Sequence, residues 1–229
     1  MNIQFYQKLT LLDYPEKTAC TVFTYGCNLR CPFCHNAALV TDAMQEPVNE
    51  DEFFDFLDKR KGLLDGVCIT GGEPLLQKDI SDFISRIKNK GFLVKLDTNG
   101  FFPEKLKELI DTCLIDYVAM DIKNSLEKYP ETCGVSNINI EKVKESVEIL
   151  KSGKVDFEFR TTVLKEYHTQ SDFESIGKWL SGNYKYYIQC FKDSGNTIAS
   201  NLNPLEEDEI FALKSTVSAY LPLCKIRGV

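Results

Sequence analysis

The chain has 229 residues, a formal net charge of −7 and a hydrophobic fraction of 43%. This length and apolar content predict one folded domain with a substantial core, and they exclude a disordered chain. The acidic balance, without any basic cluster, argues against a nucleic-acid partner. No apolar run is long enough to span a bilayer, and no secretory signal pattern opens the chain. We therefore expect a cytoplasmic protein without a membrane segment.

Short β-rich runs alternate along the chain with segments of helical periodicity. The runs cover residues 18–24, 66–70, 93–97, 117–122, 156–162 and 185–190. Such alternation predicts a parallel sheet with right-handed crossovers, and six units are too few for a closed eight-stranded barrel. We expect an α/β fold, namely an open, partial (β/α)6 barrel of the TIM type with parallel strands. It should form one domain over residues 1–229, with a short edge strand at 224–229.

Three cysteines, Cys27, Cys31 and Cys34, lie in one C-x3-C-x2-C run after the first β-rich segment. Thiolates this close in sequence can converge on one soft metal centre, and three ligands leave one position open for a substrate or cofactor. A zinc knuckle with His35 as the fourth ligand, or three unrelated buried thiols, would have the same pattern. The nine cysteines of the chain indicate metal ligation and free thiols rather than disulfides.

Polar motifs follow each of the other predicted strands, where parallel α/β folds place their sites. They are Gly71, Gly72 and Glu73 after the second run, Asp97, Thr98 and Asn99 at the third, Met120, Asp121 and Lys123 at the fourth, Arg160 and Thr162 at the fifth, and Gln189 at the sixth. Because the carboxyl ends of parallel strands meet at one edge, we predict a single catalytic face there.

The chemistry of these residues leaves alternatives open. Paired glycines let a backbone approach a ligand closely, and Glu73 can pair with an ammonium group, but a plain turn has the same pattern. Asp97 and Asp121 indicate a hard-cation site, a ribose contact or two solvated acids. Lys123 should point to the same side as Asp121, two residues earlier on an extended strand. His168 is expected in a surface loop, and no hydrolytic triad is recognisable.

The cysteine run resembles the radical SAM superfamily, in which C-x3-C-x-Φ-C holds a [4Fe–4S] cluster, with Phe33 in the Φ position here. The resemblance implies that Cys27, Cys31 and Cys34 bind the cluster and that S-adenosylmethionine (SAM) chelates the fourth iron. It also implies that Glu73 and the two glycines before it bind the amino end of SAM.

Three segments resemble the glycyl-radical-activating branch of that superfamily, which includes the pyruvate formate-lyase activases. They are Cys34-His35-Asn36, Asp97-Thr98-Asn99-Gly100 and Met120-Asp121-Ile122-Lys123. The similarity implies a Na⁺ or K⁺ site with Asp97, Thr98, Met120 and Asp121 as ligands. The implied cofactor contacts are Phe33, His35, Gly71, Gly72, Glu73, Asp97, Asn99, Asp121, Lys123, Arg160 and Gln189. Those activases carry a histidine after the last barrel strand, whereas Gln189 stands in that region here.

Leu12-Asp13-Tyr14-Pro15, Arg160-Thr161-Thr162 and Ile226-Arg227-Gly228 look most like the anaerobic ribonucleoside-triphosphate reductase activating proteins. This implies reductive cleavage of SAM to a 5′-deoxyadenosyl radical and a glycyl radical on that reductase, with a flavodoxin- or ferredoxin-type electron donor. One alternative is a radical SAM enzyme acting on a small molecule, such as a deazaguanine synthase, with residues 124–137 as a lid. Others are an activase of pyruvate formate-lyase and an electron carrier, although carriers usually use four protein ligands.

Overall fold

The computed structural model describes residues 1–43, 45–193 and 195–228. One eight-stranded sheet runs through the chain in the order β1-β2-β3-β4-β5-β6-β7-β8. The strands are β1 (Ile3–Thr10), β2 (Ala19–Thr24), β3 (Gly66–Gly71), β4 (Leu93–Thr98), β5 (Tyr117–Asp121), β6 (Asp156–Val163), β7 (Tyr186–Cys190) and β8 (Cys224–Arg227). The helices are α1 (Ala38–Thr41), α2 (Glu50–Asp58), the 3-10 helix η1 (Pro74–Leu76), α3 (Ile80–Asn89), α4 (Pro103–Asp111), α5 (Tyr129–Cys133), α6 (Ile140–Lys151), α7 (Gln170–Leu180) and α8 (Glu207–Ser218).

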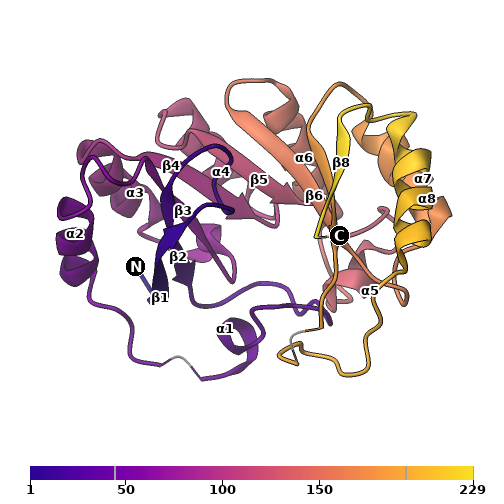
Figure 1. Cartoon of the computed structure of the whole chain (residues 1–229), viewed down its shortest axis with the longest axis horizontal. Coiled ribbons are helices and arrows are strands. Elements are labelled where there is room, and N and C mark those ends of the chain that lie inside the picture. The colour runs from indigo at the N-terminus through magenta and orange to yellow at the C-terminus, as the bar shows by residue number, and fades with distance from the viewer. Residues whose placement is uncertain (44, 194, 229) are drawn as a thin grey trace.

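The sheet is curved, open and mostly parallel, as the sequence predicts. Strands β2 to β8 pair in parallel, each with its neighbours in sequence. Figure 1 shows the sheet bending round a central space, with α2 and α3 outside one end and α7 and α8 outside the other. Because β1 and β8 lie at the two ends of the strand order and are not neighbours, the barrel does not close.

Strand β1 is the main departure from the expected fold. It pairs antiparallel with β2, so the sheet is not parallel throughout. Its burial does not alternate, because Ile3 and Thr10 are buried while residues 7–9 are exposed, and this conceals the period of two that identifies a strand. The predicted edge strand is β8, which ends at Arg227, and Val229 lies outside the described residues.

The two faces of the parallel strands differ in polarity. On β4, Val94 and Leu96 face the helices, whereas the buried Lys95 and Asp97 face the barrel interior. The helical stripe of Ile80, Phe83, Ile84 and Ile87 is buried, as expected. Every helix in the described ranges is too short or too polar to span a bilayer. The apolar core therefore lies between sheet and helices, and the interior of the barrel is left for charged groups.

A buried ion pair ties the last strand to this interior. Arg227 on β8 donates from Nη1 and Nη2 to the two carboxylate oxygens of Glu158 on β6, at 2.5 and 2.9 Å. The Tyr117 hydroxyl donates to the same carboxylate at 2.9 Å. Glu158 is 1% exposed, so its charge depends on these partners.

We predict that Arg227→Met lowers the free energy of unfolding by about 3 kcal/mol, because it leaves the Glu158 carboxylate buried without its cation. The double variant Glu158→Gln/Arg227→Met should recover much of this loss. Urea unfolding followed by circular dichroism measures both. Lys107→Met, which breaks an exposed pair with Asp111, is the matched control and should cost less than about 1 kcal/mol. An equally small cost for Arg227→Met would contradict the prediction.

Candidate functional site

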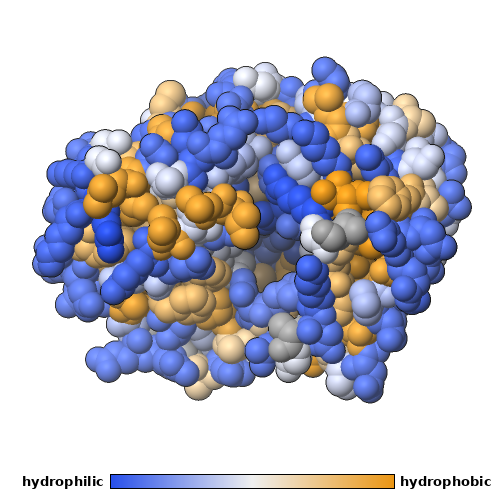
Figure 2. All heavy atoms as spheres, viewed as in Figure 1, coloured by the Kyte–Doolittle hydropathy of each residue, from blue (hydrophilic) through white to orange (hydrophobic). Residues whose placement is uncertain are grey.

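One cavity of about 410 Å³ lies at the carboxyl ends of the parallel strands, and Figure 2 shows the hollow at the centre of that face of the molecule. Its volume is in the range of sites that hold a ligand of cofactor size. Every site residue expected from the sequence lines it except Met120. The lining residues are Asp13, Cys27, Leu29, Cys31, Phe33, Cys34, His35, Asn36, Val40, Thr70, Gly71, Gly72, Glu73, Asp97, Thr98, Asn99, Asp121, Lys123, Arg160, Thr162 and Gln189.

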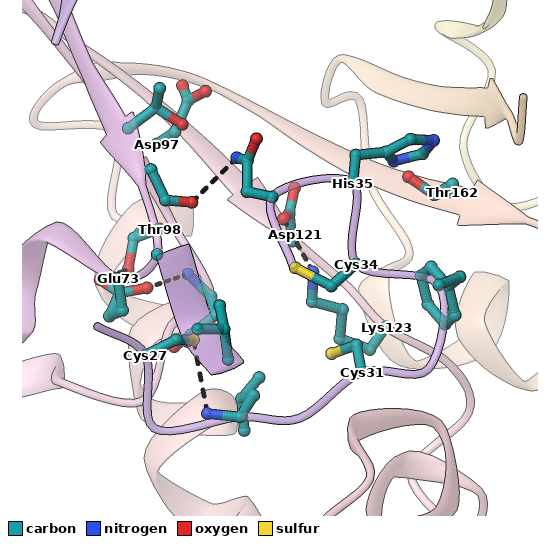
Figure 3. Close-up of a pocket in the computed structure, with 18 of the residues that line it drawn as sticks. Cys27, Cys31, Cys34, His35, Glu73, Asp97, Thr98, Asp121, Lys123 and Thr162 are labelled. Atoms are coloured by element: carbon teal, nitrogen blue, oxygen red, sulfur yellow. Dashed lines mark hydrogen bonds and ion pairs between the residues drawn. The ribbon is translucent and has the colours of Figure 1, made fainter. Parts of the chain in front are cut away.

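The cysteine loop between β2 and α1 forms one wall. The thiols of Cys27, Cys31 and Cys34 all face the cavity (Figure 3). The His35 ring turns away from them, because its Nε2 bonds the Lys192 carbonyl at 3.1 Å and the ring packs on Phe191. In residues 1–43, 45–193 and 195–228, no three His, Cys, Asp or Glu side chains are placed to hold a single metal ion. Three thiols framing a cavity are a donor set that fits an iron–sulfur cluster with one open iron.

The Gly71-Gly72-Glu73 loop packs directly on the start of the cysteine loop. A side chain at Gly72 would place its Cβ 2.0 Å from the Gly26 carbonyl oxygen, so only glycine permits this contact. Gly71 has φ 119°, and its carbonyl accepts a hydrogen bond from Asn36 at 3.0 Å. The glycines therefore set the position of Cys27, in addition to leaving backbone groups open to a ligand.

Glu73 is fully buried, and its hydrogen bonds join the loop after β3 to the end of β4. Its carboxylate accepts hydrogen bonds from the Thr98 hydroxyl at 2.8 Å, the Asn99 amide at 2.7 Å and the Leu75 amide at 3.0 Å. Burial raises the pKa of Glu73 to about 7, although these hydrogen bonds favour the charged form. Three donors occupy three of roughly four acceptor positions of a carboxylate, which leaves one for a cationic ligand.

Asp97 and Asp121 are held by protein cations. Arg160 bridges them, donating to Asp121 Oδ1 at 2.7 Å and to Asp97 Oδ2 at 3.2 Å. Lys95 pairs with Asp97, and Lys123 Nζ lies 2.9 Å from Asp121 Oδ2, on the side that the strand geometry predicts. Burial alone would raise the pKa of both carboxyl groups, but Arg160 and the lysines outweigh it and hold both below their usual range. Of the three cations that neutralise these two carboxylates, Lys123 and Arg160 line the cavity and can meet an anionic ligand there.

The Met120 side chain points away from this cavity, whereas the Phe33 side chain lines it. The Met120 side chain faces the helices and touches Gly100, where an added Cβ would lie 2.1 Å from Met120 Cε. Only the backbone of Met120 can therefore reach the cavity side of β5. Phe33 lines the cavity and packs beside Tyr167 and His168, at ring distances of 5.9 and 6.3 Å. It supplies an apolar wall next to the thiols.

His168 is not the surface residue that the sequence suggested, since it is 3% exposed. Its Nδ1 accepts a hydrogen bond from the Leu164 amide at 3.4 Å, so the neutral ring donates from Nε2 to the Lys123 carbonyl at 2.9 Å. The histidine thereby fixes the end of β5 beside the cavity. Nothing near His168 in the sequence indicates this, because Lys123 lies 45 residues earlier in the chain.

Residues 124–137 pack behind the cysteine loop, where the Arg30 amide donates to the Cys133 carbonyl, and they do not cover the cavity. Asn124 is buried and donates to the Thr132 hydroxyl and the Tyr167 carbonyl, both at 2.9 Å. The Tyr129 ring is buried against Phe101 and Trp179. None of these residues lines the cavity, so the segment is not placed as the lid that the small-molecule alternative requires.

Five lining residues were not assigned to the site from the sequence, namely Asp13, Leu29, Asn36, Val40 and Thr70. Leu29 and Val40 add apolar surface beside the cysteines, and no local pattern separates them from core residues. Asn36 and Asp13 each lie in a motif on which the family resemblance rests. The sequence therefore contained a signal that could have assigned both residues to the site. Asp13 reaches the cavity because its carboxylate accepts a hydrogen bond from the Thr21 hydroxyl on β2 at 2.5 Å.

A family model described as the Radical SAM superfamily matches residues 21–180. A protein of Methanocaldococcus jannaschii, whose name assigns it to the glycyl-radical enzyme activating enzymes, is 37% identical over 96% of this chain and 93% of its own length. A Listeria monocytogenes pyruvate formate-lyase-activating enzyme is 34% identical over 52% of each chain. A Methanospirillum hungatei 7-carboxy-7-deazaguanine synthase is 32% identical over 64% of this chain and 58% of its own.

Solved structures share the fold. Streptococcus suis SuiB bound to S-adenosylmethionine superposes with a TM-score of 0.69 at 14% identity, over 89% of this chain and 48% of that one. Coproporphyrinogen III oxidase from Escherichia coli, described as a radical SAM enzyme, has a TM-score of 0.59 at 11% identity, over 92% and 54%. At these identities the likeness concerns the fold alone.

We predict that acidification destabilises the chain through His168. Burial lowers the pKa of His168, so the unfolded chain binds this proton at higher pH than the folded chain. The stability that neutral His168 contributes is complete above the pKa of about 6.5 that histidine has in the unfolded chain, and it is lost as the pH falls below that value. Urea midpoints of the wild type should therefore drop between about pH 7.5 and 5.5. His168→Gln should lower stability at pH 7.5 but flatten this dependence, and an unchanged slope would contradict the assignment.

Proposed function

The chain belongs to the radical SAM superfamily and to its glycyl-radical-activating branch, and we propose that it generates a glycyl radical on a partner enzyme. It would act as a single radical SAM domain over residues 1–229 in the cytoplasm. The observation that carries this proposal is the meeting of three thiols, the Gly-Gly-Glu loop and the Asp–Arg–Lys network in one cavity. A [4Fe–4S] cluster on Cys27, Cys31 and Cys34 would supply one electron to the sulfonium of SAM.

The reductive cleavage of SAM consumes one electron. Cleavage of the sulfonium would yield methionine and a 5′-deoxyadenosyl radical, which would take a hydrogen atom from a glycine Cα of the partner and leave as 5′-deoxyadenosine. The chain's task is to orient SAM and to keep water and stray reactants from the radical. The electron comes from a donor of the flavodoxin or ferredoxin type.

Charge complementarity supports the proposed orientation of SAM. The buried Glu73 carboxylate attracts the ammonium group, and Lys123 and Arg160 attract the carboxylate. Gly71, Gly72 and Asn99 offer backbone and amide groups beside that end, while Phe33 provides an apolar surface for the adenine. The more exposed rim groups, His35 and Gln189, are proposed to contact the ribose region.

The partner we propose first is an anaerobic ribonucleotide reductase, because Asp13, Arg160 and Arg227 lie in the motifs that resemble activators of that enzyme. Pyruvate formate-lyase is the alternative partner, supported by the likeness to its activating enzyme over about half of the chain. Two features favour a protein substrate: the open barrel and the position of residues 124–137, which do not line the cavity. The similarity to 7-carboxy-7-deazaguanine synthases keeps a small-molecule reaction as the competing function.

We predict a glycine-type doublet in the electron paramagnetic resonance spectrum when the reconstituted chain, SAM and a reductant are mixed anaerobically with anaerobic ribonucleotide reductase. The wild type should hold about four irons per chain, as a cubane cluster requires. Cys31→Ala should abolish both the iron and the doublet, whereas Cys113→Ala, at an exposed thiol, should change neither. Deoxyadenosine formed only with a small-molecule substrate, with no doublet on this reductase or on pyruvate formate-lyase, would contradict the proposal.

We also propose that Na⁺ or K⁺ assists SAM binding at Asp97 and Asp121, with Thr98 and the Met120 carbonyl as further ligands. The affinity for SAM, measured by calorimetry, should then rise several-fold when choline in the buffer is replaced by K⁺ or Na⁺. Asp121→Asn should weaken SAM binding and leave the iron content intact. Equal affinity in choline would show that Arg160 and the lysines supply enough positive charge, and the cation proposal would fail.

A further inference from the structure

The side-chain amide of Asn99 makes a contact with the cysteine loop that the function proposed above does not use. Asn99 directly follows β4 and is 5% exposed. Its Oδ1 accepts a hydrogen bond from the Phe101 amide at 3.1 Å, which fixes how the side-chain amide is turned. The Nδ2 group therefore faces the cysteine loop, where it donates to Asn28 Oδ1 at 2.8 Å and to Cys27 Sγ at 3.7 Å.

This donor is held in place from both ends of the residue. The backbone amide of Asn99 donates to the buried Glu73 carboxylate at 2.7 Å, and the Phe101 amide holds the side chain. The Cys27 sulfur also accepts a hydrogen bond from the Leu29 backbone amide at 3.4 Å. Two N–H groups from different segments therefore converge on one sulfur of the cysteine run, and one of them comes from a side chain that a substitution can remove.

We propose that the Asn99 side-chain amide donates an N–H···S hydrogen bond to the cluster thiolate of Cys27 and thereby raises the reduction potential of the cluster. The inference rests on the cluster assigned in the proposed function. Reduction adds one negative charge to the cluster and its thiolates, and a donor aimed at a ligand sulfur stabilises the more negative state. Burial of Asn99 strengthens the interaction. Asn99 acts on the cluster through Cys27, so it is a positioning residue and not a ligand.

The test is a redox titration of the reconstituted chain with dithionite and mediators, followed by the paramagnetic signal of the reduced cluster, without partner or SAM. Asn99→Ser keeps an oxygen that can accept from the Phe101 amide but removes the donor, so its midpoint potential should fall at unchanged iron content. Asn99→Asp keeps the size and the acceptor but replaces the donor with a negative charge, so its midpoint should be the lowest. Asn139→Asp, the same change at the exposed N-cap of α6, should leave the midpoint unchanged.

Pulsed electron paramagnetic resonance supplies a second readout that packing alone would not move. When asparagine carries ¹⁵N at its side-chain amide, the reduced cluster should show a ¹⁵N coupling that Asn28→Ala retains and Asn99→Ser lacks. Midpoints of the Ser and Asp variants equal to that of the wild type, or a wild-type cluster without this coupling, would overturn the proposal. A wild-type chain that binds no cluster would instead overturn the cluster assignment, so the two failures are distinguishable. If Asn99→Ser loses its iron, the Asp variant and the coupling in Asn28→Ala still decide the question.

Discussion

The charged interior of the barrel is the constraint on which the site depends. Arg160 on β6 bridges Asp121 on β5 and Asp97 on β4, so one guanidinium joins three neighbouring strands. Two lysines complete the neutralisation of these carboxylates. Charges buried in this way persist only when each has its partner at close range. The same pairs that keep the strand ends together therefore hold Lys123 and Arg160 at the wall of the cavity.

The cysteine loop is positioned from two sides by backbone contacts that exclude side chains. Gly72 lies against Gly26 on one side, and Gly134 lies against Arg30 on the other. Each contact is closer than any Cβ permits, so the loop has little freedom to move as a body. A rigid loop is what three thiolates need in order to present a fixed set of sulfurs, since ligand geometry is set by the groups behind it.

Much of the fold and of the site is determined by local sequence. The β-rich runs and the segments of helical periodicity between them place six parallel strands within one or two residues of their observed bounds. Because the carboxyl ends of parallel strands share one edge, the motifs after those strands had to meet. The spacing of three cysteines and the step of two from Asp121 to Lys123 are likewise local, so chemistry and geometry could both be inferred from them.

The tertiary structure alone decided the features that depend on contacts between distant segments. The antiparallel β1 carries no clear alternation of its own and exists because β2 offers an edge. His168 supports the Lys123 carbonyl from 45 residues away, and the Arg30 amide donates to the Cys133 carbonyl because α5 packs behind the cysteine loop. Sequence periodicity reports which face of an element is buried, not which residue of another element it meets. The partners of Arg160, the hydrogen bonds of Glu73 and the packing of α5 behind the cysteine loop were therefore settled by the fold.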